Sequence, residues 1–347
     1  MKNKKDIAVI LMLLLTFALL ILDSKTSIQG AADGISLCLA VVIPSLFPFI
    51  VITTILQSRL LGKHFKAFKP LCNICGIPNG AESLVLLSFL GGYPIGATMI
   101  ADAYQQGGIS KSTASRMLGF CNNAGPAFLF GIAGNIFTER SAIWCLWLIH
   151  IFTALLVGIF LPNKVVAECN LKIKDPISLV NALEKGLITM GKICCWVVIF
   201  RVILNVLSHW VLWLLPPDLQ ISIYGVLELS NGIIRLKEIS HSGLRFVLCS
   251  GVVAFGGLCV YMQTHSVTKI LGTGQYFPGK ILQCLFSVLF SSILQYLIFP
   301  KEHQINLSVP FYIILCVCIF LTIFYVTRKK VVAYPECLLY NDVKSGT

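Results

Sequence analysis

Apolar runs of membrane-spanning length recur along almost the whole sequence, and they constrain the fold more than any single motif does. The 347 residues are 56% hydrophobic and 12% charged, with a mean hydropathy of +0.84. Soluble domains average about 25% charged residues, so this composition excludes the soluble globular class. At about 20 residues per crossing, the chain has room for roughly eight to ten membrane-embedded segments. The sequence therefore predicts an all-α polytopic membrane protein.

The basic residues gather in short clusters between the apolar runs. Four such clusters lie at Lys2–Lys5, Arg59–Lys69, Lys164–Lys174 and Arg328–Lys330. Cytoplasmic loops carry this excess of lysine and arginine, so we interpret the net charge of +12 as a topology signal. The alternative is a surface for polyanions. The pattern predicts cytoplasmic N- and C-termini in the cell membrane, and no nucleic-acid partner.

The cysteines and the known catalytic motifs argue against an enzyme. Most of the 14 cysteines lie inside apolar runs, where cysteine behaves as a small hydrophobic residue. The C-x-x-C pair of Cys72 and Cys75 lacks the second pair or histidine cluster that a zinc site needs. The chain has no GxSxG, HExxH or Walker A pattern. We therefore expect no metal, no cofactor and no enzymatic activity.

The apolar segments fall into two halves of a single membrane domain that comprises residues 1–347. The polar stretch 162–176 separates the halves, which cover about 35–161 and 177–327. We expect an uncleaved first helix, Ile7–Leu22, although a signal peptide is the alternative, and a closing span at Phe311–Thr327. Pro44 and Pro48 are predicted to bend or break the second span.

Each half contains one apolar element broken by a glycine pair and one polar cluster within an apolar segment. The glycine-broken elements are FLGGYP (89–94) and FGGLCVY (255–261), and the polar clusters are CNNAGP (121–126) and ELSNG (228–232). Repeated halves with interrupted helices are typical of transporters that bind their solute near the membrane midplane. The loop charges leave open whether the repeat is inverted.

The first glycine pair indicates a re-entrant hairpin. Backbone interrupted inside a membrane is tolerated only where it is buried in protein or lines a watery cavity. Gly91 and Gly92 would permit the turn beside Tyr93, Pro94 would begin the returning helix, and Gly96 would allow close packing. The N-terminus of such a half-helix suits a carboxylate. The alternative is a kinked helix that packs on its neighbours through small residues.

Three polar residues within apolar segments are the next candidates. Asn122 and Asn123 carry amides that bind a polar solute or bridge two helices. Glu228 lies in an apolar neighbourhood, where an ionisable residue is by default a functional hypothesis. We predict a site for a coupling proton or sodium ion there, helped by Ser230 and Asn231. The alternative is a glutamate at the water interface.

The second half adds a cation and a further polar lining. Arg201 lies deep in a long apolar stretch and is a candidate for a fixed cation that faces an anionic substrate, whereas Lys192 is close enough to a helix end to snorkel. The second glycine pair is predicted to form another hairpin with a polar and aromatic lining. The glycines of that hairpin are Gly256 and Gly257, and its lining residues are Tyr261, Gln263, Thr264 and His265, with a loop position as the alternative for His265.

Five motifs together carry a family resemblance. PSLFPF, GGYPIGA, GFCNNAGPAF, LELSNGI and FGGLCVYMQ occur in this order over nearly the whole chain. The sequence thereby resembles the sporulation integral membrane protein YlbJ (SpoVV) family, which is related to proteins with the nucleoside-recognition (Gate) domain. The resemblance implies a fold similar to concentrative nucleoside transporters. It also implies movement of dipicolinate across the outer forespore membrane during sporulation.

The residues and the resemblance converge on a transport core. The matching positions are Gly91–Gly96, Asn122, Asn123, Glu228–Asn231 and Gly256–Gln263. Dipicolinate is a flat aromatic dianion, which suits helix N-termini, amides, Arg201, and Tyr93 or Tyr261. We predict a secondary transporter that lies in the lipid bilayer and carries a small anionic aromatic solute. The alternatives are a nucleoside or heterocycle transporter and a non-transporting assembly factor, and a homo-oligomer stays open.

Overall fold

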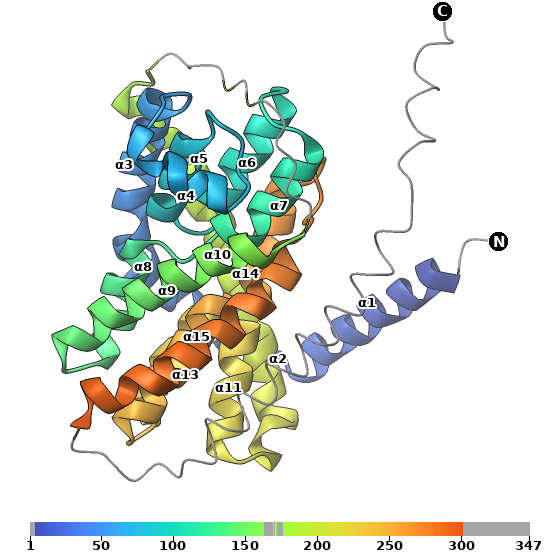
Figure 1. Ribbon diagram of the computed structural model, residues 1–347. Helices are drawn as coiled ribbons and strands as arrows, with labels where there is room; N and C mark the ends of the chain where they lie inside the picture. The colour runs from blue at the N-terminus through green and yellow to red at the C-terminus, as the bar shows by residue number, and fades with distance from the viewer. Residues whose placement is uncertain (1–3, 163–168, 170, 172–175, 301–347) are drawn as a thin grey trace, which may run out of the picture. The chain divides into compact units, whose positions relative to one another are not determined.

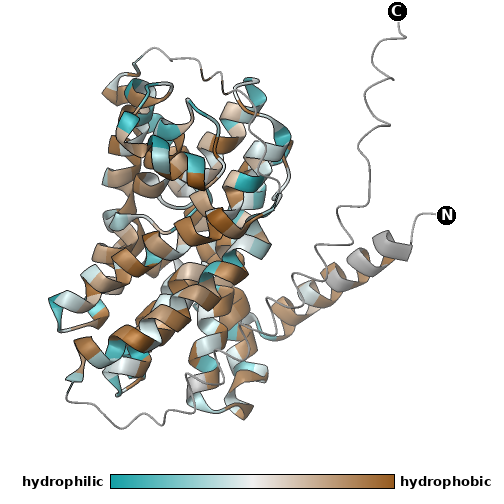
Figure 2. Cartoon of the chain, viewed as in Figure 1, coloured by the Kyte–Doolittle hydropathy of each residue, from teal (hydrophilic) through white to brown (hydrophobic). Residues whose placement is uncertain are grey.

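The computed structural model describes residues 4–162, 169, 171 and 176–300, and within them all regular structure is helical (Figure 1). Five helical stretches in this part of the chain are long and apolar enough to cross a membrane. Figure 2 shows apolar residues along much of each helix and hydrophilic residues concentrated near the helix ends. The helical membrane class is therefore confirmed. The predicted span Phe311–Thr327, the C-terminal basic cluster and most of the 162–176 stretch lie outside the described residues.

The described helices differ widely in length, and the short ones come in pairs. They are α1 (Lys4–Leu22), α2 (Ser24–Leu37), α3 (Ile43–Leu60), α4 (Lys69–Ile74), α5 (Glu82–Gly91), α6 (Ile95–Gln105), α7 (Lys111–Cys121), α8 (Pro126–Gly131), α9 (Arg140–Phe160), α10 (Leu179–Trp210), α11 (Pro217–Leu227), α12 (Leu229–Arg235), α13 (Ser242–Phe255), α14 (Gly257–Val267) and α15 (Tyr276–Ile298). Short 3-10 turns link several of them.

Helices α2 and α3 form one continuous helical stretch, Ser24–Leu60, joined by a π-helical turn at Cys38–Val42. Of the two predicted alternatives at Pro44 and Pro48, the break is therefore wrong, and the bend stays a prediction. Proline lacks an N–H, so the carbonyl one turn earlier loses its helical partner. The π turn lies over that carbonyl and absorbs the irregularity without ending the helix.

Helix α10 packs antiparallel along this stretch, and glycines make the contact close. A Cβ added at Gly30 would lie 2.9 Å from the Val202 Cα, and one at Gly34 would lie 2.9 Å from the Val198 Cα. At the opposite end, Gly186 of α10 faces Val51. Small residues at a helix interface let two backbones approach in this way. The α2–α3 stretch and α10 thus form a tightly joined pair.

Helices α5 and α6 form a helical hairpin at the first glycine pair. They have 10 and 11 residues and pack against each other. At 1.5 Å per residue each is roughly 16 Å long, about half of a bilayer core. The chain reverses at Gly92, whose φ of +73° is readily adopted only by glycine. Pro94 stands directly before the returning helix, as the sequence indicates.

A second hairpin forms at Glu228, between α11 and α12. The two helices pack on each other, and the backbones of Gly225 and Gly232 are in direct contact. The sequence instead predicts the second hairpin at Gly256 and Gly257, and this placement is wrong. There α13 and α14 continue one apolar stretch, Ser242–Val267, interrupted at Gly256 by a φ of +82°. Likewise, residues 122–125 separate α7 from α8, and we call this segment the α7–α8 interruption.

The close contact of α11 with α12 predicts a large cost for one added methyl group. We expect Gly232→Ala to lower the free energy of unfolding by about 2 kcal/mol, because its Cβ would overlap the Gly225 backbone. Gly191→Ala on α10 is the matched control, since an added Cβ there meets no atom within 4 Å. The control is expected to be neutral or up to about 1 kcal/mol more stable. Thermal unfolding in detergent measures both, and equal effects would contradict the hairpin contact.

Candidate functional site

The two hairpin tips and the two helix interruptions pack on one another through their backbones. A Cβ added at Gly92, in the first tip, would lie 2.7 Å from the Gly125 nitrogen, in the α7–α8 interruption. A Cβ added at Gly257, in the α13–α14 interruption, would lie 3.2 Å from the Gly225 oxygen and 3.3 Å from the Leu229 nitrogen of the second hairpin. Each hairpin tip therefore contacts one helix interruption closely: an added Cβ would overlap the facing backbone at Gly92 and crowd it at Gly257.

Side chains join the first hairpin and the α7–α8 interruption to the helices on either side of the α13–α14 interruption. The Tyr93 hydroxyl donates to the Val253 carbonyl at 3.4 Å, and a Cβ at Gly256 would lie 2.9 Å from that hydroxyl. The Asn122 side-chain amide donates to the Thr264 hydroxyl at 2.9 Å. The first hairpin and the α7–α8 interruption are thus tied to α13 and α14.

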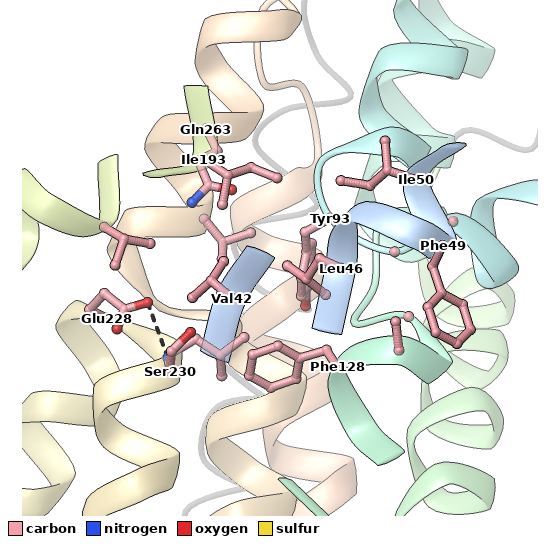
Figure 3. Close-up of a pocket in the computed structure, with 17 residues that line it drawn as sticks. Val42, Leu46, Phe49, Ile50, Tyr93, Phe128, Ile193, Glu228, Ser230 and Gln263 are labelled. Atoms are coloured by element: carbon pink, nitrogen blue, oxygen red, sulfur yellow. Dashed lines mark hydrogen bonds between the residues drawn. The ribbon is translucent and has the colours of Figure 1, made fainter. Parts of the chain in front are cut away.

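A small hollow lies between the tips (Figure 3). Both hairpins line it, together with α3, α8, α10 and α14, and its volume is about 40 Å³. Tyr93 and Glu228 face it from the first and second hairpin, and Gln263 from α14. At about 10–15 Å³ per water, the hollow has room for about three waters. A ring-sized solute fits only after the walls move.

Glu228 caps the helix that follows it. Its carboxylate accepts hydrogen bonds from the Ser230 backbone N–H at 3.1 Å and from the Asn231 backbone N–H at 2.7 Å. The Asn231 side chain donates to it as well, at 2.6 Å. Glu228 is 2% exposed, so the alternative of a glutamate at the water interface does not describe it. Its own carboxylate fills the anion-binding N-terminus of α12.

Arg201 lies behind Glu228 in a chain of polar contacts. It donates to the Asn231 side-chain oxygen at 2.6 Å and pairs with Asp33 at 3.2 Å. Asn205 donates to the same Asp33 oxygen at 3.3 Å. Asp33, Arg201 and Asn231 line a second, wider hollow of about 480 Å³. Arg201 therefore faces this second hollow with a carboxylate partner. Sequence analysis missed Asp33, because the first apolar half was expected to begin only at about residue 35.

A third hollow, of about 250 Å³, lies at the other end of the same helix pair. Thr54 of α3 and Lys185 of α10 line it. Because the α2–α3 stretch and α10 run antiparallel, the three hollows follow one another along this pair, with the narrow one in the middle. Asp33 and Thr54 are about 30 Å apart along the helix, which matches the thickness of a bilayer core.

The side chains of the paired asparagines hydrogen-bond to other groups of the protein. The Asn122 side-chain oxygen accepts from the Ala97 N–H at 3.2 Å, while its amide group donates to Thr264. Asn123 donates to the Phe120 carbonyl at 2.6 Å. Neither side chain lines the narrow hollow, so both act here as bridges between segments. Gly96 packs closely as expected, since an added Cβ would lie 2.6 Å from the Cys121 oxygen.

Sequence analysis missed a buried cation beside these asparagines. The Lys280 ammonium of α15 is 1% exposed and donates to the side-chain oxygens of Asn123 and Gln283, each at 2.7 Å. The His150 ring accepts from the Ala124 N–H at 3.1 Å in the same cluster. The available signal was a lysine and a glutamine three residues apart at the start of an apolar run.

The remaining candidates lie apart from the narrow hollow. The Tyr261 ring contacts Tyr276, with 6.1 Å between the ring centroids, and does not line the hollow. His265 and Lys192 are exposed. Among the described residues, no three histidine, cysteine, aspartate or glutamate side chains gather closely enough to hold a metal ion.

The fold and the site together define a class: a multi-pass helical membrane protein whose interrupted helices meet around a buried polar site. No family model matches the chain, and no solved structure matches it. The chain is 22% identical over 337 residues to the sporulation integral membrane protein YlbJ of Bacillus subtilis (strain 168). The match covers 83% of this chain and 82% of that protein, and it confirms the family resemblance.

The cap at Glu228 predicts unequal effects for two glutamates of the same hairpin region. We expect Glu228→Ala to lower the free energy of unfolding by about 2 kcal/mol, because buried backbone N–H groups of α12 lose their acceptor. Glu238→Ala removes only an exposed ion pair with Arg235 and is expected to change stability by less than about 0.5 kcal/mol. Thermal unfolding in detergent compares them. Similar losses in both variants would count against the cap.

Proposed function

We propose that this protein is a secondary transporter that moves a small organic anion, with dipicolinate as the first candidate, across the outer forespore membrane during sporulation. The observation that carries the proposal is the meeting of both hairpin tips and the α7–α8 interruption at one hollow, with the α13–α14 interruption packed against the second hairpin. Interrupted backbone at membrane depth is tolerated where it lines a path for polar solutes. The wider hollows at the two ends of the α2–α3 and α10 pair are the expected entrance and exit.

The order of elements supports two related halves. A long helix, a hairpin, an interrupted helix and a second long helix occur first from α2–α3 to α9 and again from α10 to α15. In this arrangement Gly92 corresponds to Glu228, and the 122–125 interruption corresponds to Gly256 and Gly257. Both hairpins have arms too short to cross a bilayer. We take them as re-entrant, as in the nucleoside transporters that the family resembles.

The charge distribution supports coupled transport of an anion. Glu228 places a carboxylate on the wall of the narrow hollow, and a bare carboxylate there repels an anion. We therefore assign Glu228 to a coupling proton or sodium ion, which would neutralise it while the solute passes. Arg201 and Lys280 supply positive charge in the two polar networks around the hollow. Opposite charges held apart in one site are a means of binding an anion together with a cation.

A nucleoside or another neutral heterocycle is the second candidate solute. The observation in its favour is the lining of the narrow hollow, in which Tyr93, Ser230 and Gln263 offer aromatic and neutral polar contacts. Arginine and lysine are absent from that lining within the described residues. A neutral solute also leaves the ion pair of Arg201 with Asp33 undisturbed.

Uptake into proteoliposomes tests the proposal. We expect the purified protein to accumulate labelled dipicolinate, and Val197→Phe to reduce the rate more than tenfold, because this α10 residue lines the narrow hollow and is 2% exposed. Ile199→Phe is the matched control: it lies two residues away on the same helix, 51% exposed, and is expected to keep the wild-type rate.

The solute that enters distinguishes the candidates. Uptake of uridine with no uptake of dipicolinate would favour the heterocycle transporter. Absence of any flux, with correctly folded protein, would favour a non-transporting assembly factor. Equal rates in the Val197 and Ile199 variants would show that the narrow hollow is not the path.

A further inference from the structure

Lys280 is a buried charge for which the described part of the chain supplies no counter-charge. Its ammonium is 1% exposed, and both of its hydrogen-bond acceptors are neutral amide oxygens, from Asn123 and Gln283. The ion pairs among the described residues leave Lys280 out. Burying an ammonium costs several kcal/mol unless a charge pairs with it. A neutral side chain would bridge the same two amides without that cost.

The neighbouring titratable group does not compensate the ammonium. His150 accepts the Ala124 N–H on its Nε2 atom, and an imidazolium has no lone pair to accept with. The ring is therefore neutral. Gln283 donates to the His150 carbonyl at 3.1 Å, which orients its side-chain oxygen toward Lys280. The cluster thus holds one buried basic side chain among neutral hydrogen-bond partners.

Two aromatic rings stand over this charge, and one of them separates it from the narrow hollow. The Lys280 ammonium lies 5.4 Å from the centroid of the Tyr93 ring and 5.8 Å from that of Tyr276. Tyr93 also lines the hollow, directly after the turn at Gly92. Its hydroxyl donates to the Val253 carbonyl at 3.4 Å, which is long for such a bond, and also interacts with the Ala124 backbone. Tyr93 is therefore a side chain that contacts both Lys280 and the hollow.

We propose that the Lys280 ammonium receives a carboxylate group of the transported anion, and that the Tyr93 ring separates the two until the solute arrives. The proposal rests on the proposed transport function and names the residue that selects for charge. An ammonium presents a point charge with three donors to a carboxylate. The Tyr93 and Tyr276 rings give a flat aromatic solute a surface to lie against.

The main test measures the uptake of dipicolinate by variants that remove or keep the charge at position 280. Lys280→Gln removes the charge and keeps donors for the two amides, so we expect the KM for dipicolinate uptake to rise more than tenfold. Lys280→Arg keeps the charge and is expected to restore most of the affinity. Lys192→Gln is the matched control, because this lysine lies on α10 with an exposed side chain. A wild-type KM in Lys280→Gln would overturn the proposal.

A second variant keeps Lys280 and pairs its ammonium with a fixed carboxylate. Gln283→Glu places a carboxylate against the ammonium, with its other oxygen near the His150 Nδ1 atom, which lies 3.5 Å from the Gln283 nitrogen. We expect this variant also to weaken dipicolinate more than tenfold, because the ammonium is already paired. If uridine is a substrate, its KM is expected to stay unchanged in both variants. Wild-type affinity for dipicolinate in Gln283→Glu would contradict the assignment.

Binding to the purified protein separates this inference from the transport proposal. Dipicolinate is expected to raise the melting temperature of the wild type in detergent and to leave that of Lys280→Gln unchanged. Stabilisation of the wild type alone, with no flux in proteoliposomes, would overturn transport and keep the binding site. Flux with the same affinity in both proteins would overturn the Lys280 site and keep transport. Neither binding nor flux with the wild type would overturn both.

Discussion

Backbone groups that a helix interruption frees at membrane depth must find partners inside the protein, and in this chain they find them beside other interruptions. Gly92 lies so close to Gly125 that an added Cβ would overlap its backbone, and Gly257 lies in tight contact with the second hairpin. The ends of the short helices are closed by side chains: the Asn122 oxygen bonds the start of α6, and the Glu228 carboxylate bonds the start of α12. Lipid offers no such partners, so the interruptions stabilise one another.

This mutual dependence concentrates polar side chains at one place in the molecule. Once four irregular segments meet, the residues around them must supply donors and acceptors, which explains the buried amides, the histidine and the two cations nearby. The polar side chains form two separate hydrogen-bond networks. Glu228, Asn231, Arg201 and Asp33 connect the second hairpin to the long helices, while Lys280 connects the first interruption to α15.

The positions of the interruptions could be predicted from the sequence, because glycine and proline within apolar runs have a strong local cost. The direction of the chain after each interruption could not. At Glu228 the chain reverses, whereas at Gly256 it continues, and this difference depends on which distant backbone packs against each glycine. Pro44 shows the opposite error, since one π turn absorbs its missing N–H. Lys280 escaped notice because charge near a helix end ordinarily reaches water.

The glycine contacts between α2 and α10 have a mechanical consequence. Gly30 and Gly34 bring the two backbones so near that neither helix slides or tilts against the other without a clash. The long helices therefore behave as a single stiff frame across the thickness of the bilayer. Enlarging the central space for a passenger then requires displacement of the short arms and their glycine turns, while this frame stays in place.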